Sequence, residues 1–357
     1  MAFLSLLLLA CSSIFAVVFL FYVTKPSISP KAGVQRPLPK EKLVPNDPDA
    51  PVSVNYFPSR QCNYACGFCF HTDTSSYMLP IDEAKKGLRL LREAGMKKLN
   101  IAGGEPFLHP KFLSKILQYC KEDLYVESIS IVSNGSKIRE DFLEKHAQWL
   151  DILAISCDSF DAETNHKIGR GEDNGKGKVN THVEYLFRVA EWCRKYNIKF
   201  KLNTVVNTYN WDEDMVEHIE RLAPFRWKVF QCLIVEGENE DETRKRDARK
   251  FLVTEEQWRT FCDKHKHLDC YIPEDNNTMA SSYLLLDENM CFLDKGEGEM
   301  KKSRSILKVG VKQAMKEVVW DKESFLDRGG IYEWTRDGLG QQQRGGCGNG
   351  DKKELEW

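Results

Sequence analysis

The sequence has almost no net charge and no internal repeat. Its 357 residues include 51 Lys and Arg against 53 Asp and Glu, which gives a formal net charge of −2. This balance creates no overall field that would attract a nucleic acid, so we expect no nucleic-acid partner, and any site for a polyanion must be local. The absence of a repeat at the period of solenoid units excludes a repeat array. The length and the 42% hydrophobic content suffice for one large domain or two modest ones.

Charge is also missing from the N-terminus. Residues 2–23 contain no charged side chain and are rich in Leu, Phe and Val. At about 1.5 Å per residue, a helix of this length crosses the roughly 30 Å core of a bilayer. A cleaved signal peptide and a lipoprotein signal ending at Cys11 are alternatives, but both lack the basic start that such signals need. We therefore expect a membrane-anchoring helix over residues 1–24.

The segment behind this helix has little that could fold. Residues 25–50 are rich in proline, and we expect them to form an extended tether. Lysine and arginine residues in the tether favour a cytosolic position for the rest of the chain, because basic residues next to a membrane helix tend to stay on the cytosolic side.

Cysteine is frequent, but it lacks the arrangement of a secreted disulfide framework. Nine of the twelve cysteines stand singly along the chain, as is typical of free thiols in a reducing compartment. The other three, Cys62, Cys66 and Cys69, form a CxxxCxxC array after a strand-like run. Thiolates at this spacing can hold three irons of a [4Fe–4S] cluster and leave the fourth iron open for a ligand. The alternatives are a zinc knuckle, which needs a fourth protein ligand, and three unrelated core cysteines.

From residue 52 onward, strand-like runs alternate with helix-like runs. We expect strands at Ser53–Phe57, Lys98–Ala102, Ser128–Val132, Ile152–Cys157, Ile198–Val206 and Trp227–Val235. We expect helices at Asp82–Ala94, Pro110–Lys121, Arg139–Trp149, His182–Tyr196 and Glu213–Leu222. Six such repeats predict an α/β fold, a partial (β/α)6 barrel with a parallel sheet over residues 51–236. Loops at the carboxyl ends of the strands then carry the function, and the cysteine array lies in one of them.

The sequence after this barrel is less regular. The repeat is lost at about Glu236, and we expect residues 237–357 to form a C-terminal extension that covers the active site. One helix is expected after Thr254, an N-cap residue followed three positions later by Gln257. Within the barrel, the Gly- and Lys-rich stretch Gly169–Lys178 is expected to be a solvated loop, with phosphate contact by its GRG sequence as the alternative.

Four of the predicted strands carry polar residues at positions i and i+2, which share one face of a strand. The pairs are Ser53/Asn55, Lys98/Asn100, Lys201/Asn203 and Arg226/Lys228. Because helices cover the outer face of such a barrel, we expect the pairs to point inward; a solvated strand end is the alternative for Lys98. Several buried cations need a counter-charge. A triphosphate supplies about four negative charges, on oxygens that suit Arg and Lys donors, so the sequence predicts a nucleotide or another polyphosphate on a basic inner wall.

Motifs at the carboxyl ends of the strands resemble a known superfamily. The cysteine array and the turn GGEP, residues 103–106, resemble the radical S-adenosylmethionine (SAM) enzymes. The longer motifs SIVSNGS, DILAISCDSF, IGRG and RWKVFQCLIVEGEN, with the C-terminal Trp357, are similar to the viperins, an antiviral family of such enzymes. The resemblance implies a [4Fe–4S] cluster on the three cysteines, with SAM on its open iron.

The resemblance also assigns site residues. SAM would be bound by Phe68, Gly103, Gly104, Glu105, Asn134 and Ser156. The nucleotide would be bound by Asn55, Lys98, Lys201, Asn203, Arg226 and Lys228, which agrees with the inner wall inferred from the strand pairs. Tyr283 would come from a loop that orders over the substrate, with an ordinary core tyrosine as the alternative.

Viperins dehydrate CTP to the chain terminator 3′-deoxy-3′,4′-didehydro-CTP by way of a 5′-deoxyadenosyl radical. The resemblance therefore implies a lyase of this kind, with UTP or GTP as alternative substrates because no residue here reads the base on physical grounds. A radical SAM maturase is a weaker alternative, since the other cysteines are too scattered for a second cluster. A membrane-anchored antiviral scaffold without catalysis is also weaker, because the cysteines and the cations are intact.

Partners and a location follow from the same resemblance. The reaction needs an electron donor, and the viperin C-terminus, here Trp357, is read by the cytosolic iron–sulfur delivery machinery. The implied location is the cytosolic face of the endoplasmic reticulum membrane, or lipid droplets. Vertebrate viperins attach through an amphipathic helix, whereas residues 2–23 are uniformly apolar and long enough to span.

Overall fold

The structure, a computed structural model, describes residues 49–171, 181–294 and 301–336. The expected membrane helix, almost the whole tether, most of the Gly169–Lys178 loop and Trp357 lie outside these residues. Within the described part of the chain, no helix combines the length and the apolar character that crossing a bilayer would require.

In the described part of the chain, ten strands form one sheet in the order β10-β9-β8-β1-β2-β3-β4-β5-β6-β7. They are β1 (Ser53–Tyr56), β2 (Lys98–Ile101), β3 (Ser128–Ser133), β4 (Ile152–Ser156), β5 (Lys199–Val206), β6 (Arg226–Gln231), β7 (Tyr271–Glu274), β8 (Leu284–Leu286), β9 (Phe292–Asp294) and β10 (Lys301–Lys302). Strands β1 to β6 pair in parallel in chain order, β7 extends the parallel sheet beside β6, and β8 extends it beside β1. Strands β9 and β10 add an antiparallel edge. The fold is α/β with a mostly parallel sheet, as the sequence predicts.

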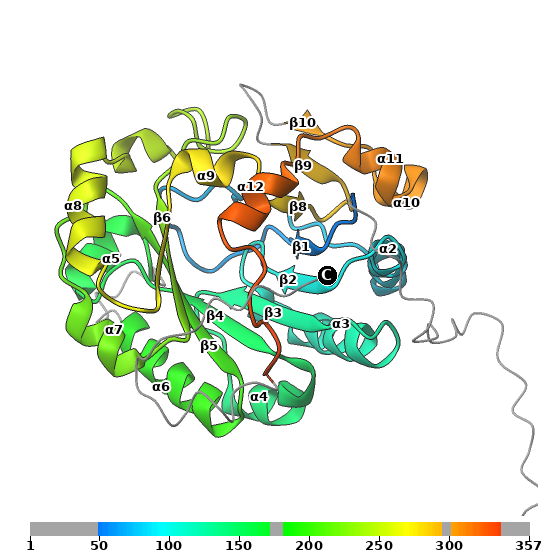
Figure 1. Ribbon diagram of the computed structural model, residues 1–357, viewed down its shortest axis with the longest axis horizontal. Coiled ribbons are helices and arrows are strands. Elements are labelled where there is room, and N and C mark those ends of the chain that lie inside the picture. The colour runs from blue at the N-terminus through cyan, green and yellow to red at the C-terminus, as the bar shows by residue number, and fades with distance from the viewer. Residues whose placement is uncertain (1–48, 172–180, 295–300, 337–357) are drawn as a thin grey trace, which may run out of the picture. The chain divides into compact units, whose positions relative to one another are not determined.

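Helices between the parallel strands cover the outer face of this sheet (Figure 1). The described helices, of which α2 to α8 lie between the parallel strands β1 to β7, are α2 (Ile81–Glu93), α3 (Pro110–Glu122), α4 (Glu140–His146), α5 (Ala162–Ile168), α6 (His182–Lys195), α7 (Val216–Leu222), α8 (Glu255–His265), α9 (Asn276–Ala280), α10 (Ile306–Val309), α11 (Val311–Met315) and α12 (Lys322–Asp327). Outward-facing strand residues such as Leu99, Ile131 and Trp227 belong with helix residues to one large apolar core. Burial of this apolar surface holds the helices on the sheet.

The opposite face of the sheet encloses an interior. Lys228 of β6 donates a 2.8 Å hydrogen bond to the hydroxyl of Tyr283, which directly precedes β8, although five strands separate β6 from β8 in the sheet. Such a contact requires the sheet to curl around the interior. The edge strands β7 and β10 do not pair with each other, so the described strands form a partial barrel.

Strand β5 shows how the sequence creates the two faces. In KFKLNTVV, Phe200 and Leu202 are buried in the core, whereas Lys201 and Asn203 are only half-buried. Successive side chains of a strand point to opposite faces, so the lysine and the asparagine face the interior. The alternation on which the predicted polar pairs were based is therefore observed.

One predicted strand is too long. Strand β6 ends at Gln231, and not at Val235, because the chain turns back after it. The side chain of Asn239 accepts a hydrogen bond from Val235 N at 2.7 Å and donates one to Phe68 O at 2.9 Å. The end of the predicted strand is thus a loop that supports the cysteine loop. Similarly, the helix predicted over Arg139–Trp149 is shorter, since α4 passes into a 3-10 turn at residue 147.

The sequence missed α5 and the strands after β6. Helix α5 begins after Asp161, whose carboxylate accepts from Thr164 N at 2.7 Å, and ends at Gly169 in the left-handed conformation. Strands β8 to β10 have three residues or fewer, too few for an alternation to be recognised. The predicted capping box of Thr254 and Gln257 is confirmed at the start of α8.

Candidate active site

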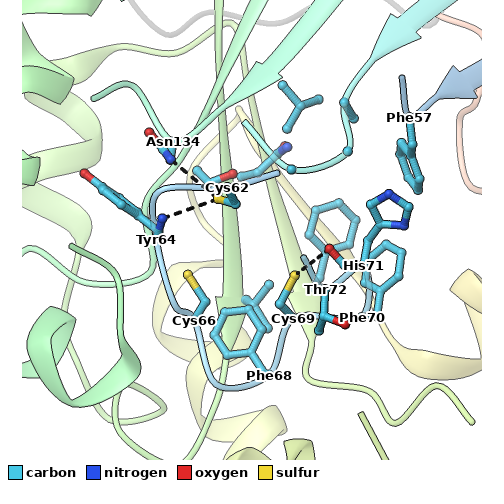
Figure 2. Close-up of a pocket in the computed structure, with 18 of the residues that line it drawn as sticks. Phe57, Cys62, Tyr64, Cys66, Phe68, Cys69, Phe70, His71, Thr72 and Asn134 are labelled. Carbon is cyan, nitrogen blue, oxygen red and sulfur yellow. Dashed lines mark hydrogen bonds between the residues drawn. The ribbon is translucent and has the colours of Figure 1, made fainter. Parts of the chain in front are cut away.

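The carboxyl ends of the parallel strands surround a cavity of about 310 Å³, whose lining is shown in part in Figure 2. This size is typical of sites for small molecules. The predicted site residues that line it are Cys62, Cys66, Cys69, Phe68, Gly103, Gly104, Asn134, Ser156, Asn55, Asn203 and Tyr283. The other predicted residues, Glu105, Lys98, Lys201, Arg226 and Lys228, do not line this cavity.

The three cysteines lie on one loop between β1 and α2, with their thiols arranged around one space (Figure 2). The end of α5 fixes this loop: Ala65 N donates to Gly169 O at 3.1 Å, and Gly67 N donates to Ile168 O at 2.9 Å. A side chain at residue 169 would place its Cβ 2.4 Å from the carbonyl oxygen of Ala65, and the φ of +81° there also favours glycine. The IGRG motif therefore holds the cysteine loop in place.

The cysteine loop fits a group that supplies positive charge. Burial raises the pKa of Cys62 to about 11 and that of Cys66 to about 12, and it also raises the pKa of Cys69. Thiolates, the form that ligates iron, are therefore unfavourable in the protein alone, and a bound metal cluster would stabilise them. Tyr64 N lies 3.4 Å and Asn134 Nδ2 lies 3.9 Å from Cys62 Sγ. Such donors stabilise a thiolate ligand.

The GGEP turn packs against the chain just before the cysteines. Gly104 N donates to Ser59 O at 2.9 Å, and Glu105 N donates to Gln61 O at 2.8 Å. A Cβ at Gly104 would lie 1.9 Å from the Gln61 carbonyl oxygen, so a larger residue would displace the backbone that leads into the cysteine loop. This glycine has a packing role in addition to its predicted contact with SAM.

Glu105 is buried beneath the same turn. Its carboxylate accepts hydrogen bonds from Asn134 N at 2.7 Å, from Ser133 Oγ at 2.9 Å and from Phe107 N at 3.0 Å. Burial raises the pKa of Glu105 to about 7 in spite of these donors. Glu105 thus orders the turn that presents Asn134 to the cavity, and its own contact with SAM stays a prediction.

Among the lining residues that the sequence analysis did not select, two carry opposite charges. Asp158 and Arg170 form a buried ion pair. Burial lowers the pKa of Arg170, but Asp158 and Cys66 outweigh this effect and raise it, so a permanent cation lies close to the thiols. Arg170 is only 6% exposed, so the prediction of a solvated loop is wrong at this residue. A buried guanidinium is suited to hold a ligand carboxylate.

Two asparagines and a tyrosine also line the cavity: Asn55 of β1, Asn203 of β5, and Tyr283 just before β8. Asn203 Oδ1 is buried and has no hydrogen-bond partner among the described residues. Buried polar atoms are normally paired, so this oxygen indicates a position for a ligand. Asn55 Nδ2 donates to Leu284 O at 3.1 Å. Tyr283 connects the cavity with the interior behind it, through its hydrogen bond from Lys228.

Cations line the interior at the amino-terminal ends of the strands. Lys98 begins β2, Arg226 begins β6, and Lys201 is in register with Arg226. Lys98 Nζ donates to Tyr332 OH at 2.5 Å, and both Lys98 and Arg226 lie 4.4 Å from the centre of the Tyr332 ring. Aromatic faces attract cations but do not neutralise them. We call Lys98, Lys201, Arg226 and Lys228 the cationic wall.

The charged forms of this wall are unfavourable in the protein alone. Burial lowers the pKa of Lys201 to about 8, and it lowers the pKa values of Lys98 and Lys228 well below their usual range. Neighbouring cations, Arg226 among them, lower these pKa values further, whereas the carboxylate of Glu274 acts in the opposite direction on Lys228 and Lys201. A polyanion would remove this penalty. A triphosphate on this wall stays a prediction, and these charges are the feature that such a ligand would complement.

Two charged residues beside the wall, Arg328 and Glu274, were not predicted from the sequence. The Arg328 guanidinium lies 3.8 Å from the centre of the Tyr283 ring. The buried carboxylate of Glu274 pairs with both Lys228 and Arg328. Glu274 ends β7, a strand that was not predicted, and Arg328 follows α12, so no periodic pattern or motif marks either of them.

Comparison with known proteins identifies the family. Residues 56–223 match the family model of the Radical SAM superfamily. Over 288 residues, the chain is 52% identical to the S-adenosylmethionine-dependent nucleotide dehydratase RSAD2 of Oncorhynchus mykiss, a match that covers 80% of this chain and 81% of the relative. The protein of the same name from Danio rerio is 53% identical, with 80% and 79% of the two chains covered. The chain belongs to the S-adenosylmethionine-dependent nucleotide dehydratases.

This dehydratase family is that of the viperins, so the resemblance of the motifs is confirmed. A relative from Flammeovirga pacifica is 33% identical, over 79% of this chain and 96% of its own length. Members of the radical SAM superfamily use a [4Fe–4S] cluster and SAM, and these are the cofactors that the cysteine loop of this dehydratase predicts and that its buried thiols fit.

Solved structures share the fold of the dehydratase at low identity. Histidine-tagged anSMEcpe with bound AdoMet has a TM-score of 0.58 and 16% identity, over 76% of this chain and 80% of that one. Streptococcus suis SuiB bound to S-adenosylmethionine has a TM-score of 0.57 and the same identity, over 79% and 68%. These matches show the radical SAM fold.

Proposed function

We propose that this chain converts CTP to 3′-deoxy-3′,4′-didehydro-CTP. Relatives that share half of its residues carry the name nucleotide dehydratase, and the motifs that resemble viperins favour CTP. The observation that supports the proposal most is the continuity of the interior. Tyr283 lines the cavity that holds the cysteines and also contacts Lys228 of the cationic wall. One nucleotide can therefore place its phosphates on the wall and its sugar at the cavity.

The residues divide the work between the two ends of the interior. The cluster and SAM, when bound, would supply radical chemistry for the ribose. Cys62, Cys66 and Cys69 would hold the cluster, while Lys98, Lys201 and Arg226 would bind the phosphates and so fix the distance of the ribose from the cavity. The aromatic and aliphatic part of the lining, which includes Phe57, Phe230 and Leu285, would exclude water from a reactive carbon.

Anaerobic turnover tests the activity. The protein, reconstituted with iron and sulfide under reducing conditions, is given SAM and each of the four ribonucleoside triphosphates in turn. With CTP, the reaction should produce 5′-deoxyadenosine from SAM and a nucleotide that is lighter than CTP by one water. If 5′-deoxyadenosine is released equally fast or faster with UTP or GTP, the proposal that CTP is the preferred substrate is wrong. If 5′-deoxyadenosine is released at the same rate without any nucleotide, the dehydratase assignment is contradicted.

We further propose that residues 2–23 attach the enzyme to the endoplasmic reticulum membrane or to lipid droplets, and that Trp357 engages the iron–sulfur delivery machinery. Both proposals rest on the sequence, since these residues lie outside the described part. Deleting residues 1–45 should leave the chemistry unchanged and make the protein diffuse in the cytosol. Removing Trp357 should lower the iron content of protein purified from cells, and chemical reconstitution should restore turnover.

A further inference from the structure

One carboxylate stands among the cations of the interior. The side chain of Glu274 is only 1% exposed. Its Oε1 pairs with Lys228 Nζ and lies 3.5 Å from Arg328 Nη1, and its Oε2 accepts a hydrogen bond from the hydroxyl of Tyr283. Burial raises the pKa of Glu274, but Lys228 and Arg328 outweigh it and lower the pKa below its usual value. Glu274 is therefore negatively charged at neutral pH.

Strand register places this carboxylate at the cavity end of the interior. Glu274 is in register with Phe230, which lines the cavity, whereas Lys228 lies one inward-facing position nearer the amino-terminal ends of the strands and Arg226 lies two. Residues in register in a parallel sheet share a face and a level. A nucleotide with its phosphates on Arg226 and its ribose at the cavity would thus bring its sugar to the level of Glu274.

The distribution of charge separates two subsites. Among the described residues, Lys98, Lys201 and Arg226 have no carboxylate within ion-pair distance, whereas Glu274 neutralises one unit of the charge on Lys228 and Arg328. An anion is attracted to the first three cations but is repelled by a buried carboxylate. A hydroxyl group, in contrast, can donate a hydrogen bond to it. The level of Glu274 therefore suits a sugar and not a phosphate.

Tyr283 shows that an O–H group can reach this carboxylate from the cavity. Its hydroxyl accepts from Lys228 at 2.8 Å and donates to Glu274, and its side chain lines the cavity. A ribose hydroxyl has the same donor and acceptor capacity as this phenol. Since a carboxylate has about four lone-pair positions, a ribose hydroxyl can bind beside the tyrosine or replace it.

We propose that Glu274 is a specificity-determining residue that accepts a hydrogen bond from a ribose hydroxyl of the nucleotide, with Lys228 and Arg328 holding its carboxylate in place. The inference deepens the proposed function and rests on it, because it takes Lys98, Lys201 and Arg226 of the cationic wall to be the phosphate site. It predicts that the enzyme distinguishes ribonucleotides from deoxyribonucleotides through a charged acceptor. Carboxylates that bind ribose hydroxyls in dinucleotide sites work by the same chemistry.

The test compares Glu274→Gln with the unchanged enzyme, using calorimetric binding of CTP, 2′-deoxy-CTP and 3′-deoxy-CTP to protein without SAM. Gln keeps an oxygen for Tyr283 and Lys228 but removes the charge. We expect the variant to lose about 10-fold or more in CTP affinity, as is usual for a hydrogen bond to a charged group. It should lose much less with the deoxynucleotide that lacks the bound hydroxyl. Glu140→Gln, on the exposed start of α4, is the matched control and should leave the affinities for all three nucleotides unchanged.

The outcomes separate this inference from the proposed function. If the unchanged enzyme binds no nucleoside triphosphate, the proposed function fails. If it binds CTP but Glu274→Gln loses the same factor with all three nucleotides, or binds CTP more tightly, the carboxylate only balances charge and the ribose contact is refuted. Thermal unfolding checks that the variant is folded. Should it unfold, Glu274→Asp, which keeps the charge on a shorter side chain, must still narrow the preference for CTP over the deoxynucleotide, or the inference is wrong.

Discussion

Burial disfavours the charged forms of the side chains at both ends of the interior, the anionic thiolates at the cavity and the cationic lysines at the wall. At the cavity, burial raises the pKa values of Cys62 and Cys66 to about 11 and 12, so their anionic forms are unfavourable. At the cationic wall, burial lowers the pKa of Lys201 to about 8 and lowers the pKa of Lys98 well below its usual range, so their cationic forms are unfavourable. A ligand of the opposite charge would therefore stabilise each end: the iron of the cluster at the cysteines and, under the proposed function, the phosphates of the nucleotide at the wall.

The two ends also differ in how they are built. The cysteines are held by backbone hydrogen bonds from the end of α5 to Ala65 and Gly67, so their geometry depends on a loop. The cations stand on strands of the sheet, and the face of Tyr332 covers two of them. Loss of one ligand should therefore leave the other end largely intact, because different segments of the described chain hold the cysteine loop and the cationic wall, although Tyr283 contacts both ends. The predictions below test this independence.

The largest effect is expected at the cysteine end. Cys66→Ala should abolish the brown chromophore and SAM cleavage, because two thiolates cannot hold the cluster. CTP should still bind, as measured by calorimetry, if the wall is independent. Cys120→Ala, a substitution at a buried cysteine of α3 in the apolar core, is the control and should retain both. Normal SAM cleavage by Cys66→Ala would contradict the cluster site, and loss of CTP binding would contradict the independence.

The next effect concerns the wall. Arg226→Ala should raise the KM for CTP roughly 10- to 150-fold, because it removes a charge-assisted contact of about 1.5–3 kcal/mol. SAM binding and the chromophore should not change. Arg139→Ala, at an exposed arginine, controls for the loss of a positive charge. An unchanged KM in the Arg226 variant would show that this side chain does not meet the substrate.

A pH titration gives a smaller effect that also distinguishes the ends. The folded pKa of Lys201, about 8, is below its unfolded value, so unfolding binds a proton between pH 8 and the normal lysine range, and stability should rise with pH there. A bound polyanion favours the charged lysine. CTP affinity should therefore fall above pH 8, by at most roughly tenfold per pH unit for one proton. In Lys201→Met, CTP affinity measured by calorimetry should depend less on pH above pH 8. An equal pH dependence in the variant would show that Lys201 does not bind the phosphates.

Regular features of the fold could be predicted from the sequence, whereas contacts between distant segments could not. The period-2 pattern of β5 revealed that Lys201 and Asn203 face inward, because alternation is local. The ion pairs of Glu274 with Lys228 and Arg328 join β7 to β6 and to the end of α12. No local pattern encodes them. The burial of Arg170 was also missed, since it depends on an ion pair with Asp158 across the short helix α5, which the sequence analysis did not predict.

The smallest expected effect lies between the two ends, at Asn203. Its Oδ1 has no partner among the described residues, and an unpaired buried acceptor destabilises the folded protein. Asn203→Ala should therefore leave the unfolding temperature of the ligand-free protein unchanged or slightly higher. CTP affinity should fall only about 2- to 12-fold, as for one neutral hydrogen bond of about 0.5–1.5 kcal/mol.

Asn207→Ala is the matched control, because the side chain of Asn207, which is buried directly after β5, already has partners in the protein. It donates a hydrogen bond to Val205 O at 3.0 Å and accepts one from Tyr209 N at 3.0 Å. The control should lower the unfolding temperature and leave CTP affinity unchanged. If Asn203→Ala instead destabilises the ligand-free protein as the control does, the amide of Asn203 stabilises the folded protein, and its proposed contact with the ligand is refuted.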